Sequence, residues 1–222
     1  MTAEPQAAST VQNHWWWRPG WRVGRHYYAC HLTLDDLPKL RELVQQYQDV
    51  MSRLPNLDLI PPQWLHVTMQ GIGFVDEVSD DELAAVTEHL RELLRRTARP
   101  VVTFHRPTIR REAVVLKAEP AEPLRHLRMA MYDTIAPVLD QGTFSVSEPR
   151  PGPGQFTPHV SAAYVNDDGP AEPIAEAIGT IDPEPVTVTF RAASLLVFHR
   201  DHRMYEWTQA TPLPIGPAGS AS

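Results

Sequence analysis

The chain has 222 residues, of which 42% are hydrophobic and 21% charged, as in globular proteins that bury a substantial core. Its formal net charge of −7 argues against a protein that coats long nucleic acids, because that affinity comes from neutralising many phosphates. One cysteine, Cys30, rules out an intrachain disulfide, and the sequence shows neither a signal-peptide pattern nor an apolar run of about 18 residues. We therefore expect a cytoplasmic protein that does not span a membrane.

The two ends of the chain differ in composition from its body. Residues 1–13 are small and polar, and residues 213–222 are rich in proline, glycine and serine, so we expect a disordered N-terminal tail and a flexible C-terminal tail. Residues 14–24 hold four of the six tryptophans together with two arginines and form a separate arm. The folded domain is expected over residues 25–212.

The body opens with a strand followed by a helix. Residues 25–34 have the aromatic and β-branched character of a strand, and the two acidic residues Asp35 and Asp36 stand where a helix N-cap is expected. The next residues carry apolar side chains at three- and four-residue steps, which predicts a helix. Its apolar face consists of Leu37, Leu40, Val44, Tyr47 and Met51.

A second strand, residues 64–73, contains a histidine between apolar neighbours. Side chains alternate between the two faces of a strand, so one face is polar while Leu65, Val67 and Met69 take the other. The polar face carries His66, Thr68 and Gln70. Residues 79–97 follow with the strongest helical period of the chain, with Ser79 as the expected cap and acidic residues in the first turn.

The second half of the chain repeats this plan. A strand at 113–120 leads into a helix, and a loop rich in proline and glycine leads into a second histidine-bearing strand at 158–165. The helix carries Leu124, Leu127, Met131, Ile135 and Val138. The segment PVVTF at 100–104 also resembles PVTVTF at 185–190. These matches predict two lobes related by internal duplication.

The duplicated strands each offer an imidazole and a hydroxyl on one face. His159 and Ser161 in the second copy match His66 and Thr68 in the first. Two such lobes can face one groove, where a neutral histidine takes a proton from water or an alcohol and a protonated histidine gives one to the departing oxygen. The hydroxyls can donate hydrogen bonds to phosphate oxygens. This chemistry requires no metal or other cofactor, and which histidine is the acid stays open.

These residues resemble the 2H phosphoesterase superfamily, and within it the bacterial 2′-5′ RNA ligase and cyclic phosphodiesterase branch. The matching motifs are His66-Val67-Thr68 and His159-Val160-Ser161, the second preceded by Pro158, within a resemblance that covers residues 25–211. The resemblance implies a bilobal α+β fold, with two antiparallel sheets flanking a central cleft and helices on the outside. It also implies opening or formation of 2′,3′-cyclic phosphates or 2′-5′ linkages in RNA or small nucleotides.

Substrate contacts beyond these motifs are expected near the arm. Trp17, Arg25 and Tyr27 are the residues that we expect to reach the site, by stacking on a base or pairing with phosphate. The alternative is that the arm packs its indoles over a seam between the lobes. Three consecutive tryptophans cannot all face one ligand on an extended chain, which favours packing for the arm as a whole.

Three further residue groups favour structural roles. Tyr164 alternates away from His159 and is expected in the core, and Tyr205 and His199 are expected to pack on the closing strands. The segment HRDH at 199–202 is not expected to bind a metal, because three-residue spacing puts its two histidines on opposite faces of a strand and the segment stands at an expected hairpin turn.

The leading hypothesis is a monomeric, metal-independent phosphodiesterase that opens 2′,3′-cyclic phosphates at an RNA terminus or in a small nucleotide. A related alternative is 2′-5′ RNA ligation, the near-reverse of 2′-5′ cleavage. A second class of alternative is a module that binds nucleotide ends in the same cleft without turnover. A third is an interaction protein whose tryptophan arm is the working surface.

Overall fold

Antiparallel strands form two sheets that join into one ten-stranded array where the two histidine-bearing strands meet, β4 (His66–Phe74) and β8 (His159–Val165). This computed structural model describes residues 8–139, 150, 152 and 155–217. Within these residues, the Cα pair Val67↔Val160 is the one register pair that joins β4 to β8. The first sheet has the order β12-β11-β2-β4 and adds β12 (Glu206–Pro214), β11 (Ala192–His199) and β2 (Tyr27–Thr33). The α+β class with two antiparallel sheets is confirmed.

The second sheet has the order β8-β7-β5-β10, and short strands extend it. Its members beside β8 are β7 (Ala113–Glu119), β5 (Val101–Phe104) and β10 (Val186–Thr189). The strand β3 (Leu57–Leu59) pairs with β8, and β6 (Thr108–Ile109) pairs with β7. The two sheets therefore share the same arrangement. In each, the histidine strand lies at the shared edge, and a second strand pairs with it, β2 with β4 and β7 with β8.

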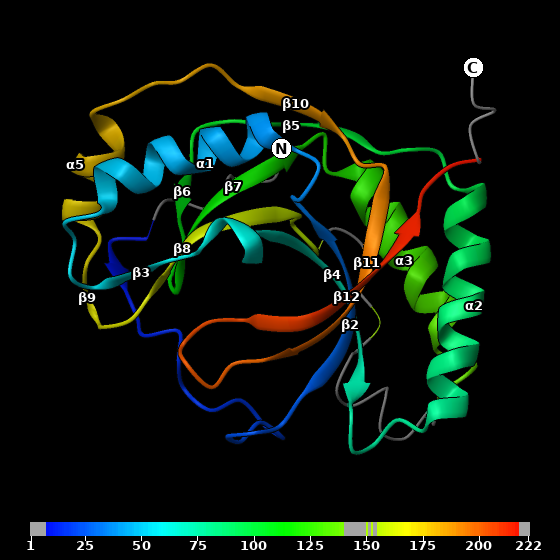
Figure 1. Cartoon of the computed structure of the whole chain (residues 1–222). Helices are drawn as coiled ribbons and strands as arrows, with labels where there is room; N and C mark the ends of the chain where they lie inside the picture. Colours follow the sequence, from blue (N-terminus) through cyan, green and yellow to red (C-terminus); the bar gives the residue numbers. More distant parts are fainter. Residues whose placement is uncertain (1–7, 140–149, 151, 153–154, 218–222) are drawn as a thin grey trace.

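Helices cover the outer faces of both sheets (Figure 1). They are α1 (Pro38–Met51), α2 (Asp80–Arg96), α3 (Glu122–Ile135) and α5 (Glu172–Gly179), with a 3₁₀ turn η1 (Pro62–Trp64) before β4. Helices α2 and α3 pack together, α2 against β12 and α3 against β4, whereas α1 packs against β8, β10 and α5. Helix α1, which follows β2 of the first sheet, thus packs on the second sheet, and α3, which follows β7 of the second sheet, packs on the first. Among the described residues, no helix has the length and apolarity needed to span a membrane.

The helix starts were predicted with mixed success. Ser79 caps α2 through a capping box, because its side chain accepts from the Glu82 amide while the Glu82 carboxylate accepts from the Ser79 amide. The expected Asp35 or Asp36 cap of α1 is wrong. The N-cap is Leu37 without a side-chain bond, and Pro38 opens the helix, where its missing N–H costs no hydrogen bond.

Both histidine strands contain a β-bulge beside the hydroxyl residue. Opposite Cys30 and Leu32 of β2, β4 advances by three residues, from Gln70 to Val67. Opposite adjacent residues of β7, β8 advances by two residues, from Ala163 to Ser161. An extra residue reverses the alternation of side chains beyond it, so the faces expected after Thr68 and Ser161 are exchanged.

The described parts of both ends are more ordered than expected. Strand β1 (Thr10–Val11) pairs with β9 (Gly169–Pro170), and Val11 is buried in the main core. At the other end β12 extends to Pro214, and Ile215 is buried. The tails predicted at 1–13 and 213–222 are therefore wrong for residues 10–11 and 213–215, because these segments bury apolar side chains. Residues 1–7 and 218–222 lie outside the described residues.

Candidate active site

His66 and His159 are held in the same way at the start of their strands. The Nδ1 atom of His66 lies 2.9 Å from the carbonyl oxygen of Trp64, and Nδ1 of His159 lies 2.7 Å from that of Thr157. A carbonyl oxygen can only accept, so each Nδ1 carries a proton and donates it. In the neutral ring Nε2 is then unprotonated. Each histidine therefore has its second nitrogen available to take or give a proton.

Both histidines line one cavity of about 1100 Å³ together with Thr68 and Ser161. The four residues that sequence motifs predicted as a catalytic set are thus brought together by β4 and β8. The cavity has the size expected of a site for a small organic ligand such as a nucleotide. Its walls come from both sheets, which places the cleft along their common edge.

Burial favours the neutral form of both histidines. Loss of hydration lowers the pKa of His66, and burial together with the nearby charge of Arg110 lowers the pKa of His159 to about 4. An anion bound in the cavity acts in the opposite direction, because it stabilises an imidazolium. Of the three arginines in the described lining, Arg18 is paired with Glu112, and Arg110 and Arg128 supply positive charge for such an anion.

Tyr164 lines this cavity, which corrects the expectation that it faces away from His159. The bulge in β8 returns Tyr164 to the face of Ser161, to which its hydroxyl is hydrogen-bonded. Burial raises the pKa of Tyr164, so the hydroxyl stays protonated. Gln70 changes face in the other direction, because it is fully buried and its neighbour Gly71 lines the cavity instead.

The arm contributes to the cleft, but through residues other than those expected. His14, Arg18 and Trp21 line the cavity, and the His14 ring stacks on Tyr164 with 4.3 Å between ring centroids. Arg18 donates to Glu112, another lining residue, at 3.0 Å. The arm therefore forms one wall of the cleft as well as covering part of the core.

Arg25 and Trp17 are not among the described residues that line the cavity. Arg25 is buried in a clamp, with Nε 2.8 Å from Asp76, one terminal nitrogen 2.6 Å from Glu77 and its guanidinium 3.6 Å above the Phe74 ring. Trp17 is half exposed, with its ring centroid 6.0 Å from the Arg200 guanidinium. Neither residue lies in the described lining, so their contact with substrate stays a prediction.

Tyr27, the third expected contact, does line the cavity, within a set of aromatic residues. Trp207 is part of that set and meets His66 edge to face at 5.6 Å between centroids. Several lining residues were not predicted from the sequence, namely His31, Arg110, Arg128, Tyr205 and Trp207. No motif marks them, because strands and a helix from distant parts of the chain bring them together.

Comparison with known proteins identifies the family. The family model described as the 2′-5′ RNA ligase superfamily matches residues 35–202, which include both histidine motifs. The chain belongs to the 2′-5′ RNA ligase superfamily. A Bacillus licheniformis protein named "Putative phosphoesterase" is 33% identical over 134 residues, which are 59% of this chain and 68% of that protein. Membership of a superfamily of phosphoesterases is therefore shown.

Solved structures share the superfamily fold at low sequence identity. A protein of Thermus thermophilus aligns with a TM-score of 0.60 and 19% identity, over 85% of this chain and 97% of that one. LigT of E. coli, solved in complex with 3′-AMP, aligns with a TM-score of 0.57 and 16% identity, over 85% and 98% of the two chains. LigT in complex with phosphate gives a TM-score of 0.56 at 14% identity, over 87% and 99%.

Proposed function

We propose that the cleft opens 2′,3′-cyclic phosphates of RNA ends or small nucleotides, with His66 and His159 as the acid-base pair. The observation that carries this proposal is the matched pair of Nδ1 bonds, which leaves two Nε2 atoms available to one cavity. Each histidine also has a hydroxyl residue two positions later, Thr68 or Ser161, in the same lining. Two proton-transfer groups on opposite sides of a ligand are what in-line cleavage of a phosphodiester requires.

The reaction needs one histidine in each protonation state. The neutral histidine takes a proton from water as the water oxygen forms a bond to phosphorus. The protonated histidine gives its proton to the 2′ or 3′ oxygen as that P–O bond breaks, so the product is a phosphomonoester. Thr68 and Ser161 donate hydrogen bonds to the non-bridging oxygens, whose charge grows in the transition state. The two histidines exchange protonation states, and they are restored when the base loses its proton to solvent and the acid takes one up.

Binding of the substrate favours the protonated form that one of the two histidines needs. Burial lowers the pKa of each histidine and so favours the neutral form of both. A phosphodiester carries one negative charge, which raises the pKa of the nearer imidazole and favours uptake of one proton. Arg110 and Arg128 line the same cavity and hold the anion without donating a proton themselves.

Two features support a nucleotide rather than a bare phosphate. The cavity volume of about 1100 Å³ exceeds what a phosphate fills, and Trp21, Tyr27 and Trp207 give it aromatic surface on which a base can stack. LigT, which shares the fold, has been solved with 3′-AMP and with phosphate. The net charge of −7 favours an RNA terminus or a mononucleotide over a long polymer, because long nucleic acids are bound by neutralising many phosphates.

The test is ring opening of an oligonucleotide that ends in a 2′,3′-cyclic phosphate, in the presence of a chelator. His66→Ala and His159→Ala should each lower the rate by about 10²- to 10⁴-fold, because each removes a proton-transfer group. His89→Ala is the matched control, since His89 is exposed on α2 and should leave the rate unchanged. Equal rates in all four proteins, or binding of the oligonucleotide without any turnover, would exclude the proposal.

A further inference from the structure

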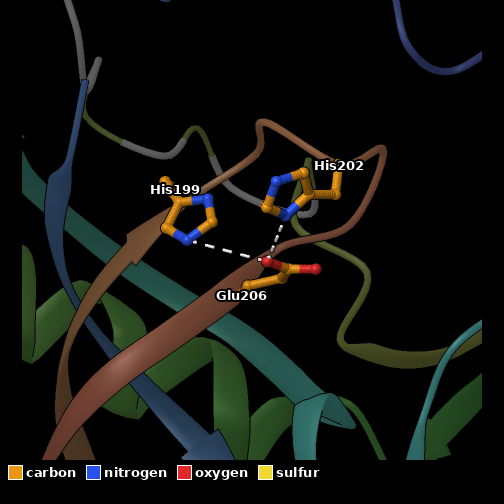
Figure 2. Close-up of side chains that lie close together, drawn as sticks. All are labelled: His199, His202 and Glu206. Carbon is orange, nitrogen blue, oxygen red and sulfur yellow. Dashed lines mark hydrogen bonds and ion pairs between the residues drawn. The ribbon is translucent and has the colours of Figure 1, made fainter. Parts of the chain in front are cut away.

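A second group of potential ligands lies at the hairpin between β11 and β12, apart from the proton-transfer histidines. His199 ends β11, His202 lies in the turn and Glu206 begins β12 (Figure 2). The expectation that the two histidines point to opposite faces is wrong, because strict alternation ends at His199 and the turn curls His202 back over the hairpin. Their side chains converge on the Glu206 carboxylate, as the dashed lines in Figure 2 show.

The distances within this group are close to those of a metal site. One nitrogen or oxygen from each residue lies within 4.8 Å of the other two. Nδ1 of His202 is 2.9 Å, and Nε2 of His199 is 3.6 Å, from the same Glu206 oxygen, Oε2. A tetrahedral zinc ion with ligands at about 2.0–2.1 Å holds them about 3.3–3.4 Å apart, so the observed separations bracket that value. Because His202 is exposed, its ring can turn to adjust its distance from the His199 ring without disturbing the core.

Asp201, which lies beside His199, can orient this histidine as a metal ligand. Its Nδ1 lies 3.8 Å from Asp201 Oδ2, and both Asp201 carboxylate oxygens accept from the Gly24 amide, at 3.2 and 3.1 Å. The Asp201 backbone amide donates to His199 Nδ1 at 3.4 Å, so Nδ1 is unprotonated in this arrangement. A metal on Nε2 requires the ring proton on Nδ1, and a small turn of the ring would then replace the Asp201 amide by the Asp201 carboxylate as the partner of Nδ1. The arm thus fixes the group that would orient the ligand. His199 and Glu206 are mostly buried, with 13% and 17% of their side-chain surface exposed.

We propose that His199, His202 and Glu206 bind a divalent transition-metal ion of the zinc class, with water in the fourth position. Two imidazoles and one carboxylate favour zinc over calcium or magnesium, which prefer sets made of oxygen ligands. The ion would join both strands of the hairpin, next to Phe198, Tyr205 and Trp207, which line the cleft. It would fix that wall, and it takes no part in proton transfer by His66 and His159.

The experiment is a zinc titration of tag-free protein by calorimetry, after treatment with a chelator and its removal, followed by cobalt absorption spectra. Wild-type protein should bind one zinc ion, with a cobalt spectrum of a tetrahedral site that lacks thiolate bands. His202→Ala and Glu206→Gln should each weaken binding at least 10-fold, and Asp201→Asn should weaken it about 10- to 100-fold. Thermal unfolding of each variant without metal checks that the hairpin still folds, and the exposed position of His202 makes His202→Ala the safest variant.

Two controls separate this site from other histidines. His89→Ala tests an exposed histidine on α2, and His66→Ala tests whether the cleft is the binding site. Both should keep the wild-type affinity for zinc. Absence of binding by the wild-type protein would leave only a His202–Glu206 ion pair and would overturn the proposal. Unchanged affinity in His202→Ala, or loss of binding in His66→Ala alone, would overturn it as well.

Discussion

Thr68 and Ser161 give the sharpest test of the cleft at the scale of single residues. Each lies two positions after a histidine on its strand and lines the same cavity. Thr68→Val and Ser161→Ala should each lower the turnover number for a cyclic phosphate by about 10²-fold, because the lost hydrogen bond acts on the charge of the transition state. Ser161→Thr keeps a hydroxyl and should retain most of the rate. Steady-state kinetics that show a change in KM alone would contradict this role.

Four single residues show what a sequence pattern can and cannot predict. His66 and His159 were predictable because each occurs in a recognisable triplet within a duplicated plan. The positions of Arg25 and Tyr164 were not predictable in this way. Arg25 is drawn into a clamp by Asp76, 51 positions away, and Tyr164 changes face through a bulge. Neither pairing partners nor bulges are encoded in the local alternation of side chains.

At the scale of elements, the Arg25 clamp ties the start of β2 to the segment that links β4 and α2. Arg25→Met removes a buried guanidinium from two carboxylates that are partly exposed and can regain water, at 47% and 38% of their side-chain surface. The free energy of unfolding should fall by about 1–3 kcal/mol. Arg22→Met should change it by less than about 1 kcal/mol, because Arg22 contacts the same Asp76 from an exposed position.

The clamp prediction is checked by urea denaturation together with the rate of ring opening. Because Arg25 is not part of the cavity lining among the described residues, the folded Arg25→Met protein should keep its rate per molecule. A rate loss of 10-fold or more in a fully folded sample would show that Arg25 contacts substrate after all. Elements such as α2 were predictable from their period and cap, whereas the clamp depends on how those elements pack.

At the scale of the whole molecule, buried histidines make stability depend on pH. Burial lowers the pKa of His31 to about 3 and that of His14 to about 3, below the value of about 6.5 expected in the unfolded chain. Between those values the unfolded state binds more protons than the folded state, so acidification favours unfolding. Stability should therefore fall as the pH drops from about 6.5 toward 4, by at most about 1.4 kcal/mol per pH unit for each such histidine.

Replacement of one buried histidine should reduce that slope. In urea denaturation between pH 5 and pH 8, His31→Asn should lose part of the acid-dependent change in unfolding free energy, whatever its stability at pH 8. His89→Ala, which changes an exposed position, should keep the wild-type slope. A slope that is unaffected by His31→Asn would contradict the assignment of a low pKa to this histidine.

The duplicated plan of the molecule was readable from the sequence, but its assembly was not. Two strand-helix units and two histidine strands predicted two lobes around a cleft. The crossing of α1 and α3 to the opposite sheets was not predictable, because a helical period shows which face is apolar and not which sheet covers it. The same holds for the arm. Its tryptophan-rich composition set it apart in the sequence, but its contact with the cleft depends on the fold.

The proposal that His66 and His159 act as one catalytic unit is tested most directly by the double variant. Single-turnover opening of a 2′,3′-cyclic phosphate is measured in chelator for wild-type protein, for His66→Ala, for His159→Ala and for both together. Each single variant should lose about 10²- to 10⁴-fold, and the double variant should be no slower than the slower single variant by more than a few-fold, because residues that act as a unit are not additive. Losses that multiply in the double variant, or a single variant that retains the wild-type rate, would contradict the paired mechanism.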